Sequence, residues 1–64
     1  MYQVTAIYGD EEVGYGEGET YEWAASECAE SVSEMYPASE VLLVCTRGVI
    51  QMRTPLDIWQ EFAA

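Results

Sequence analysis

Carboxylates are the reactive side chains that this chain has in excess, and most of them lie in one segment. The chain has twelve Asp and Glu residues against two Arg, with no Lys and no His, so its formal net charge is −10. Nine of the twelve lie between Gly9 and Pro37, where no basic residue occurs. The electric field of so many negative charges repels nucleic acid and anionic membranes and attracts basic protein surfaces. We therefore expect the partner to be a basic, nucleic-acid-binding protein of the host, and we expect no direct binding to nucleic acid or membrane.

The residue types that most enzymes use for catalysis are missing. Without His or Lys, the chain has no imidazole base, no Schiff-base nucleophile and no usual set of transition-metal ligands. A hydrolase that uses a pair of carboxylates is the one enzyme class that remains, and 64 residues leave little room for a closed substrate cleft. We predict that the protein is not an enzyme and uses no cofactor.

The acids and glycines near the start do not form a known ion or phosphate motif. Asp10 and Glu12 fit the first two positions of a calcium-binding loop, but Gly14 and the absence of a distal Glu break that pattern. The stretch GYGEG (Gly14–Gly18) lacks the spacing of phosphate-binding loops, and the carboxylate of Glu17 would repel a phosphate. We predict no metal site and no phosphate site.

The start of the chain, MYQVTAIYG, has no basic region and no long apolar run, so it does not read as a signal peptide. No stretch approaches the roughly 20 apolar residues that a membrane span needs. We expect a cytoplasmic protein of a bacterial host. Cys28 and Cys45 could pair, but in that compartment two cysteines are usually buried, reduced thiols, and we expect this state.

The apolar pattern predicts one α+β domain over residues 1–64, in the order β-(β)-α-β-β-α. The expected elements are a strand (Tyr2–Tyr8), a turn (GDEE), a second strand or an irregular loop (Val13–Gly18), a helix (Thr20–Tyr36), two hairpin strands (Val41–Thr46 and Val49–Thr54) and a closing helix (Pro55–Ala64). Thr20 is the expected N-cap of the long helix, and Pro37 ends it. We expect an antiparallel sheet of three or four strands to pack on this acidic helix.

The long helix is predicted to have an apolar face and an acidic face. At 100° per residue, the apolar face holds Tyr21, Ala25, Cys28, Val32, Met35 and Tyr36, and the opposite face holds Glu22, Glu27, Glu30 and Glu34. Three of these acids follow an i, i+3, i+7 pattern, which makes a row with about 5–6 Å between neighbours. Trp23 falls within the acidic arc, where it can anchor an interface or fold back onto the glycine-rich segment.

The acidic helix face is the predicted partner-binding surface. Its predicted residues are Glu22, Trp23, Glu27, Glu30 and Glu34, and the negative field is extended by Asp10, Glu11, Glu12, Glu17 and Glu19. Trp23 or Tyr15 would supply apolar contact area. Carboxylates spaced by one helical turn lie on a scale similar to the phosphates of a nucleic-acid strand, so this face can imitate them.

Small, very acidic α+β chains of this kind resemble the phage-type DNA-mimic inhibitors, which include anti-restriction, anti-CRISPR and uracil-DNA glycosylase inhibitor proteins. The stretch ECAESVSEMYPASEVLLVCT, about a third of the chain, is similar to the helix-to-strand passage of the uracil-DNA glycosylase inhibitors. Its triplet Glu30-Ser31-Val32 resembles the Glu-Ser-aliphatic triplet that those inhibitors place in the enzyme's DNA-binding cleft. The resemblance implies that Glu30 stands in for a phosphate. In the family the triplet lies at a strand edge, whereas here it falls within the predicted helix.

Two other interpretations fit the sequence. A phage-type regulator could bind host RNA polymerase or another enzyme by ordinary surface complementarity, through the sheet edge or through Ile58, Trp59 and Phe62. The i, i+3 spacing of Trp59 and Phe62 favours core packing for these two residues instead. A small subunit that dimerises through its sheet is the third interpretation, so both a monomer and a dimer fit the sequence.

Overall fold

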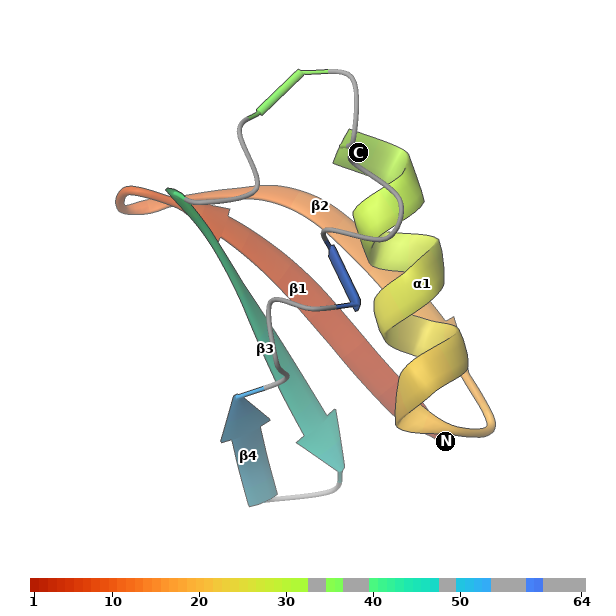
Figure 1. Ribbon diagram of the computed structural model, residues 1–64. Coiled ribbons are helices and arrows are strands. Elements are labelled where there is room, and N and C mark those ends of the chain that lie inside the picture. The colour runs from red at the N-terminus through yellow and green to blue at the C-terminus, as the bar shows by residue number, and fades with distance from the viewer. Residues whose placement is uncertain (33–34, 37–39, 48–49, 54–57, 60–64) are drawn as a thin grey trace.

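The computed structural model describes residues 1–32, 35–36, 40–47, 50–53 and 58–59, and for Arg47 and residues 50–53 it describes the backbone alone. Its elements are β1 (Tyr2–Tyr8), β2 (Glu11–Gly18), α1 (Tyr21–Val32), β3 (Val41–Arg47) and β4 (Ile50–Arg53). One helix packed on an antiparallel sheet confirms the predicted α+β class (Figure 1). Of the predicted closing helix, Ile58 and Trp59 are helical, and the remainder lies outside the described residues.

The four strands form one antiparallel sheet in the order β2-β1-β3-β4. The first strand is central, because it pairs with β2 through a hairpin and with β3 across the chain. Helix α1 follows the edge strand β2 in the chain and packs over β1 and β2 on one face of the sheet (Figure 1). This placement leaves the opposite face of the sheet as an outer face that none of the described elements covers.

The hairpin between β1 and β2 turns more tightly than the sequence predicted. Tyr8 pairs with Glu11, so the loop holds only Gly9 and Asp10, and Gly9 has a φ of 66°. A glycine with positive φ at the first central position is typical of a two-residue hairpin turn. The expected four-residue turn is therefore wrong, and its last two acids belong to β2. The register then shifts between Ala6 and Ile7, which marks a bulge near the start of β2.

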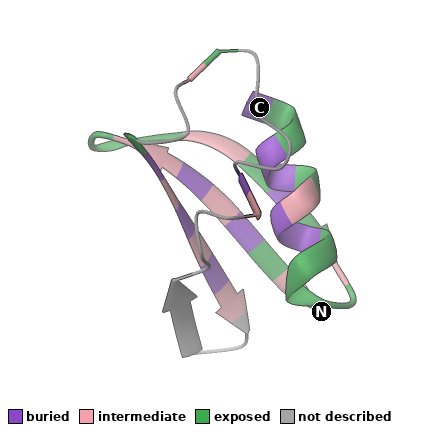
Figure 2. Cartoon of the chain, in the orientation of Figure 1, coloured by how far each residue is buried: buried purple, intermediate pink, exposed green. Residues whose placement is uncertain are grey.

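The core lies between α1 and the inner face of the sheet. Its buried residues are Val4, Ala6, Ala24, Ala25, Cys28, Ala29, Val32, Val41, Leu43, Cys45 and Trp59 (Figure 2). Strand residues two apart point to the same face, so Val41, Leu43 and Cys45 all face inward. Both cysteines are free thiols in this core, as the sequence predicted. Burial raises the pKa of Cys28 to about 11.

The described helix ends at Val32, four residues before the predicted end. Met35 lies in a turn and Tyr36 in a bend, and the N–H groups of both donate to the carbonyl of Val32, at 3.0 Å and 3.3 Å. The ring of Tyr36 packs on that of Tyr8, with centroids 4.9 Å apart, and this contact holds the chain toward the β1–β2 turn. The prediction that Met35 lies on the buried face is wrong, since 67% of its surface is exposed. Pro37 lies outside the described residues.

Among the described residues, no helix combines the length and the hydropathy that crossing a membrane requires.

Candidate partner-binding site

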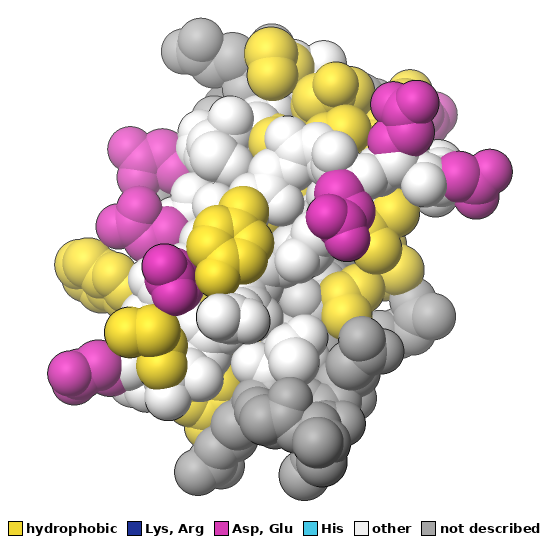
Figure 3. Space-filling view, turned by 180° about the vertical axis from the view of Figure 1, so that it is seen from behind, with side chains coloured by type: hydrophobic (Ala, Val, Ile, Leu, Met, Phe, Trp, Pro, Cys, Tyr) yellow, Lys and Arg dark blue, Asp and Glu magenta, His cyan; other side chains and the backbone are white. Residues whose placement is uncertain are grey.

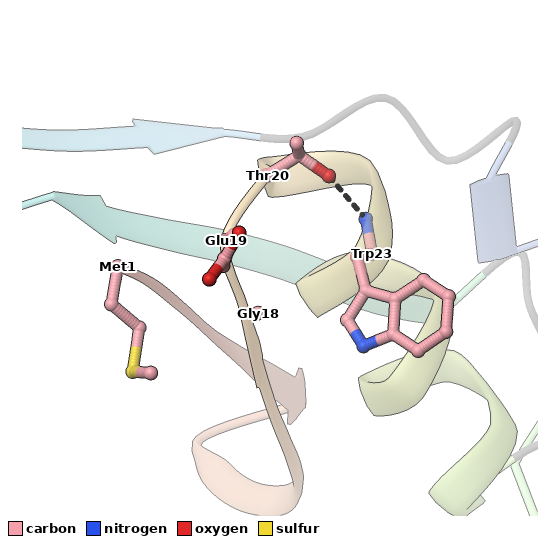
Figure 4. Close-up of a pocket in the computed structure, with 5 residues that line it drawn as sticks. All are labelled: Met1, Gly18, Glu19, Thr20 and Trp23. Carbon is pink, nitrogen blue, oxygen red and sulfur yellow. Dashed lines mark hydrogen bonds between the residues drawn. The ribbon is translucent and has the colours of Figure 1, made fainter.

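Helix α1 begins where the sequence predicted, at a threonine N-cap. The hydroxyl oxygen of Thr20 accepts a hydrogen bond from the backbone N–H of Trp23 at 3.2 Å, and the carbonyl of Thr20 accepts from the N–H of Ala24 at 3.1 Å. An N-cap side chain satisfies one of the amide groups that lack a partner in the first helical turn. The cap therefore fixes the first turn of α1, which carries Trp23 (Figure 4).

Three glycines of β2 set how closely α1 approaches the sheet. Gly14, Gly16 and Gly18 alternate along the strand, so all three face the helix. A Cβ at Gly16 would meet the backbone of α1, namely the carbonyl oxygen of Ala24 and the nitrogen of Cys28. The helix thus lies directly on the backbone of β2. The glycine-rich stretch is a strand built for close helix packing.

The same close packing holds one side of Trp23 against β2. A Cβ at Gly18 would meet the Cδ1, Cγ and Cβ atoms of Trp23. Yet 61% of the surface of Trp23 remains exposed. The sequence left two alternatives for Trp23, namely an exposed interface anchor or a side chain folded back onto the glycine-rich segment. Each holds in part, because the indole lies along β2 and still presents most of its surface to solvent.

The predicted acids of α1 face solvent. Glu22, Glu27 and Glu30 are exposed, and the buried residues of the helix lie on its other side, so the predicted segregation of the two faces is confirmed for these positions. Glu34 lies outside the described residues. The described side chains include neither Lys nor Arg, because the side chains of Arg47 and Arg53 are not among them.

Two open hollows flank Trp23. One has a volume of about 280 Å³ and is lined by Trp23, Ser26, Glu27 and Glu30, which all belong to α1. The other has a volume of about 410 Å³, and its lining residues are Met1, Gly18, Glu19, Thr20 and Trp23. In Figure 4 the indole of Trp23 and the side chain of Met1 lie on either side of the segment that carries Gly18 and Glu19. Trp23 is the residue that the two hollows share.

The remaining predicted acids are exposed but do not join one row with those of α1. Glu12 pairs with Ile7, and Glu17 pairs with Gln3, so both lie on the outer face of the sheet, away from the helix. Figure 3, which views the molecule from behind, shows acidic side chains spread over this side. Asp10 and Glu11 lie at the hairpin turn, at the far end of β2 from Trp23. Of the five predicted acids outside α1, Glu19 alone lines a hollow with Trp23.

Tyr15 is a second exposed aromatic residue beside a carboxylate. Half of its surface is exposed, and it lies on the outer face opposite Thr5. Desolvation is the main cause that raises the pKa of Tyr15, and the negative charge of Glu17 and a hydrogen bond to it raise the pKa further. Tyr15 and Trp23 therefore lie on opposite faces of the sheet.

The triplet that resembles the glycosylase inhibitors lies in the last turn of α1. Val32 is buried, and the hydroxyl of Ser31 donates to the carbonyl of Cys28 at 2.6 Å, within the helix. Only Glu30 of the three presents a charged group to solvent. The helical conformation that the sequence predicted for this triplet is confirmed, and it differs from the strand edge that the family uses.

The apolar residues near the C-terminus belong to the core rather than to a surface. Trp59 is fully buried, and Ile58 packs partly buried against the same cluster. The indole N–H of Trp59 has no hydrogen-bond partner within the described part of the chain. Contact with a partner through Trp59 is therefore excluded in this fold, and Phe62 lies outside the described residues.

Among the described residues, no three Asp, Glu or Cys side chains lie together in a group that could hold a metal ion.

Comparison of the chain with protein-family models, with curated proteins and with solved structures finds no match.

Proposed function

We propose that this protein is a small acidic inhibitor that blocks the nucleic-acid-binding surface of a host enzyme by DNA mimicry. It would act in the cytoplasm of a bacterial host as a counter-defence protein of phage type, directed at a CRISPR effector, a restriction enzyme or a DNA-repair enzyme. The partner is a basic protein, and neither nucleic acid nor membrane is bound directly. No catalytic step, metal or cofactor takes part.

The observation that carries this proposal is the exposed acidic side of α1. Glu22, Glu27 and Glu30 project from one rigid helix, and an exposed Trp23 lies among them. Of these described acids, Glu27 and Glu30 are one helical turn apart, which separates their Cβ atoms by about 5–6 Å, a scale on which phosphates also repeat along a strand. A helix packed directly on the backbone of β2 holds these groups in fixed relative positions, which limits the ordering entropy lost on binding.

The excess negative charge has a physical reason in this proposal. Neighbouring like charges on a helix cost roughly 0.2–0.5 kcal/mol per pair in the free protein. A basic cleft on the partner would convert that repulsion into attraction and would steer association. We therefore expect the association rate to fall steeply as salt is added, because screening shortens the range of this field.

Capture from a bacterial lysate tests the proposal. The immobilised protein should retain one nucleic-acid enzyme, which rising salt and competing DNA should both release. The triple variant Glu22→Lys, Glu27→Lys, Glu30→Lys should lose this enzyme. A control variant with the same change in net charge, Glu11→Lys, Glu12→Lys, Glu17→Lys, should retain it, because Glu12 and Glu17 lie on the outer face and Glu11 lies at the hairpin turn, far from Trp23.

Circular dichroism must first show that both triple variants remain folded. Retention of the same enzyme by the α1 variant would refute mimicry by this helix. Equal loss in the two variants would show that overall charge, and not the helix row, governs binding.

The outer face of the sheet supports a second candidate, a regulator that binds RNA polymerase or another host enzyme by ordinary complementarity. Ile7, Leu42 and Val44 share this face and are half-buried, and Tyr15, which lies on the same face across Thr5 from Val44, is half-exposed. A partner held there should remain bound at high salt, ignore competing DNA and be lost with Tyr15→Ala. The same capture experiment therefore separates the two candidates.

A further inference from the structure

We propose that the hollow beside Trp23 binds an arginine side chain of the partner. The guanidinium group would stack on the indole and donate hydrogen bonds to the carboxylate of Glu27. This inference rests on the proposed function, because it names the chemical group on the basic surface that α1 recognises. It adds a selectivity for one type of basic residue, which mimicry by charge alone does not have.

The geometry of the hollow suits a flat cationic group. Trp23 forms one wall, and Ser26, Glu27 and Glu30 form the rest, around a volume of about 280 Å³. All four residues belong to the first three turns of α1, where the N-cap and the close packing on β2 hold the backbone. The indole stays 61% exposed although Gly18 supports one side of it. An aromatic surface is thus held ready beside carboxylates.

Charge complementarity decides what occupies this hollow. A cation over the face of an aromatic ring is attracted by the ring, and tryptophan gives the strongest attraction. The carboxylates on the hollow's rim exclude an anion, and a neutral apolar side chain would strip them of water without compensation. A basic side chain satisfies both the indole and the acids.

Arginine fits better than lysine for three physical reasons. Its guanidinium is planar and stacks on an aromatic face, its fork of N–H groups matches a carboxylate in two-point contact, and it is more weakly hydrated than an ammonium group. The compact ammonium group of lysine can satisfy the carboxylate but gains less from the indole. The wall formed by Trp23 is therefore the main source of selectivity, and Glu27 adds affinity for both with a smaller preference for arginine through two-point contact.

Two peptides of equal length and charge, an oligo-arginine and an oligo-lysine, provide the test. Calorimetry at fixed salt gives their affinities, and acrylamide quenching of tryptophan fluorescence reports burial of Trp23, since Trp59 is fully buried from the start. We expect the arginine peptide to bind roughly two- to fivefold more tightly than the lysine peptide. It should also protect Trp23 from the quencher.

Variants locate the selectivity. Trp23→Ala should lose most of the preference for the arginine peptide, and Trp23→Phe should keep more of it. Tyr15→Ala is the matched control, since it also removes an exposed aromatic side chain beside a carboxylate but lies on the outer face. It should leave the preference unchanged. Glu27→Gln should weaken both peptides more than Glu22→Gln, because Glu22 does not line the hollow.

The inference is overturned if the parent protein does not distinguish the two peptides, or if folded Trp23→Ala keeps the same preference. These outcomes are independent of the proposed function, because the peptides require no host enzyme. If the protein captures an enzyme that DNA releases but shows no preference for the arginine peptide, this inference alone is refuted. An arginine preference that depends on Trp23, in a protein whose capture ignores the charge of α1, would sink the proposed function and leave the arginine site standing.

Discussion

Replacing Gly16 with alanine is the sharpest test of how α1 is seated. Gly16 is buried in the middle of β2, and its missing Cβ leaves room for the helix backbone itself. The new methyl group would fall closer than 3.0 Å to the Ala24 carbonyl oxygen and the Cys28 nitrogen, and at 2.9 Å from the Cβ of Glu27. Backbone atoms cannot rotate away as a side chain can. The whole helix must therefore move off the strand.

The expected cost follows from that movement. Separating α1 from β2 by roughly an ångström loosens the contacts of the buried helix residues, and overpacking of this kind costs about 1–3 kcal/mol. Alanine also restricts the unfolded chain, which returns about 0.4–1 kcal/mol. We expect a net loss of about 1.3 kcal/mol, which lowers the Tm of a domain of this size by roughly 5–10 °C. A core this small typically leaves only about 3–5 kcal/mol of stability, so the loss is a large share.

Thermal unfolding followed by circular dichroism measures this loss, and two variants calibrate it. The atoms nearest to a Cβ at Gly18 belong to the side chain of Trp23 and not to the helix backbone, and turning the indole relieves all of these contacts except the one with its Cβ, so Gly18→Ala should lower the Tm less than Gly16→Ala does. Gly9→Ala lies in open space at a φ of 66°, which strains an L side chain, so its loss of Tm measures backbone strain without crowding. If Gly16→Ala melts within a few degrees of the parent, α1 does not rest on the backbone of β2 and the reasoning fails.

Two further predictions concern the ends and the core of α1. Thr20→Ala removes the cap of the Trp23 N–H and should cost about 1 kcal/mol, or roughly 4–8 °C in Tm, whereas Thr20→Ser should retain most of it; equal melting of both variants would contradict the capping role. Burial raises the pKa of the Cys28 thiol from 9.0 to about 11, so the thiol's contribution to stability is complete below pH 9 and is lost as the pH rises toward 11. Urea unfolding should show the free energy of the parent falling more steeply over this interval than that of Cys28→Ala, and parallel curves would refute the assignment.

Features that depend on composition or on near neighbours followed from the sequence. The charge excess and the absence of His and Lys are properties of the composition, and no fold can change them. The start of α1 at Thr20 was predictable because an N-cap acts on an amide three residues away. The strands β1 and β3 were predictable because runs of β-branched and aromatic residues bounded by turn residues read as strands. The exposure of Glu22, Glu27 and Glu30 to solvent followed from the periodicity of the helix.

Features that depend on contacts between distant segments needed the tertiary structure. The alternation of Gly14, Gly16 and Gly18 was visible in the sequence, but only the position of α1 shows that the missing side chains make room for a helix. The same close approach places the indole of Trp23 along Gly18. Trp23 nevertheless stays exposed, because open hollows lie on both sides of it. Trp59 is a core residue because it packs with strands far earlier in the chain. Periodicity reports which way a side chain points from its own backbone, whereas exposure depends on what the rest of the chain brings against it.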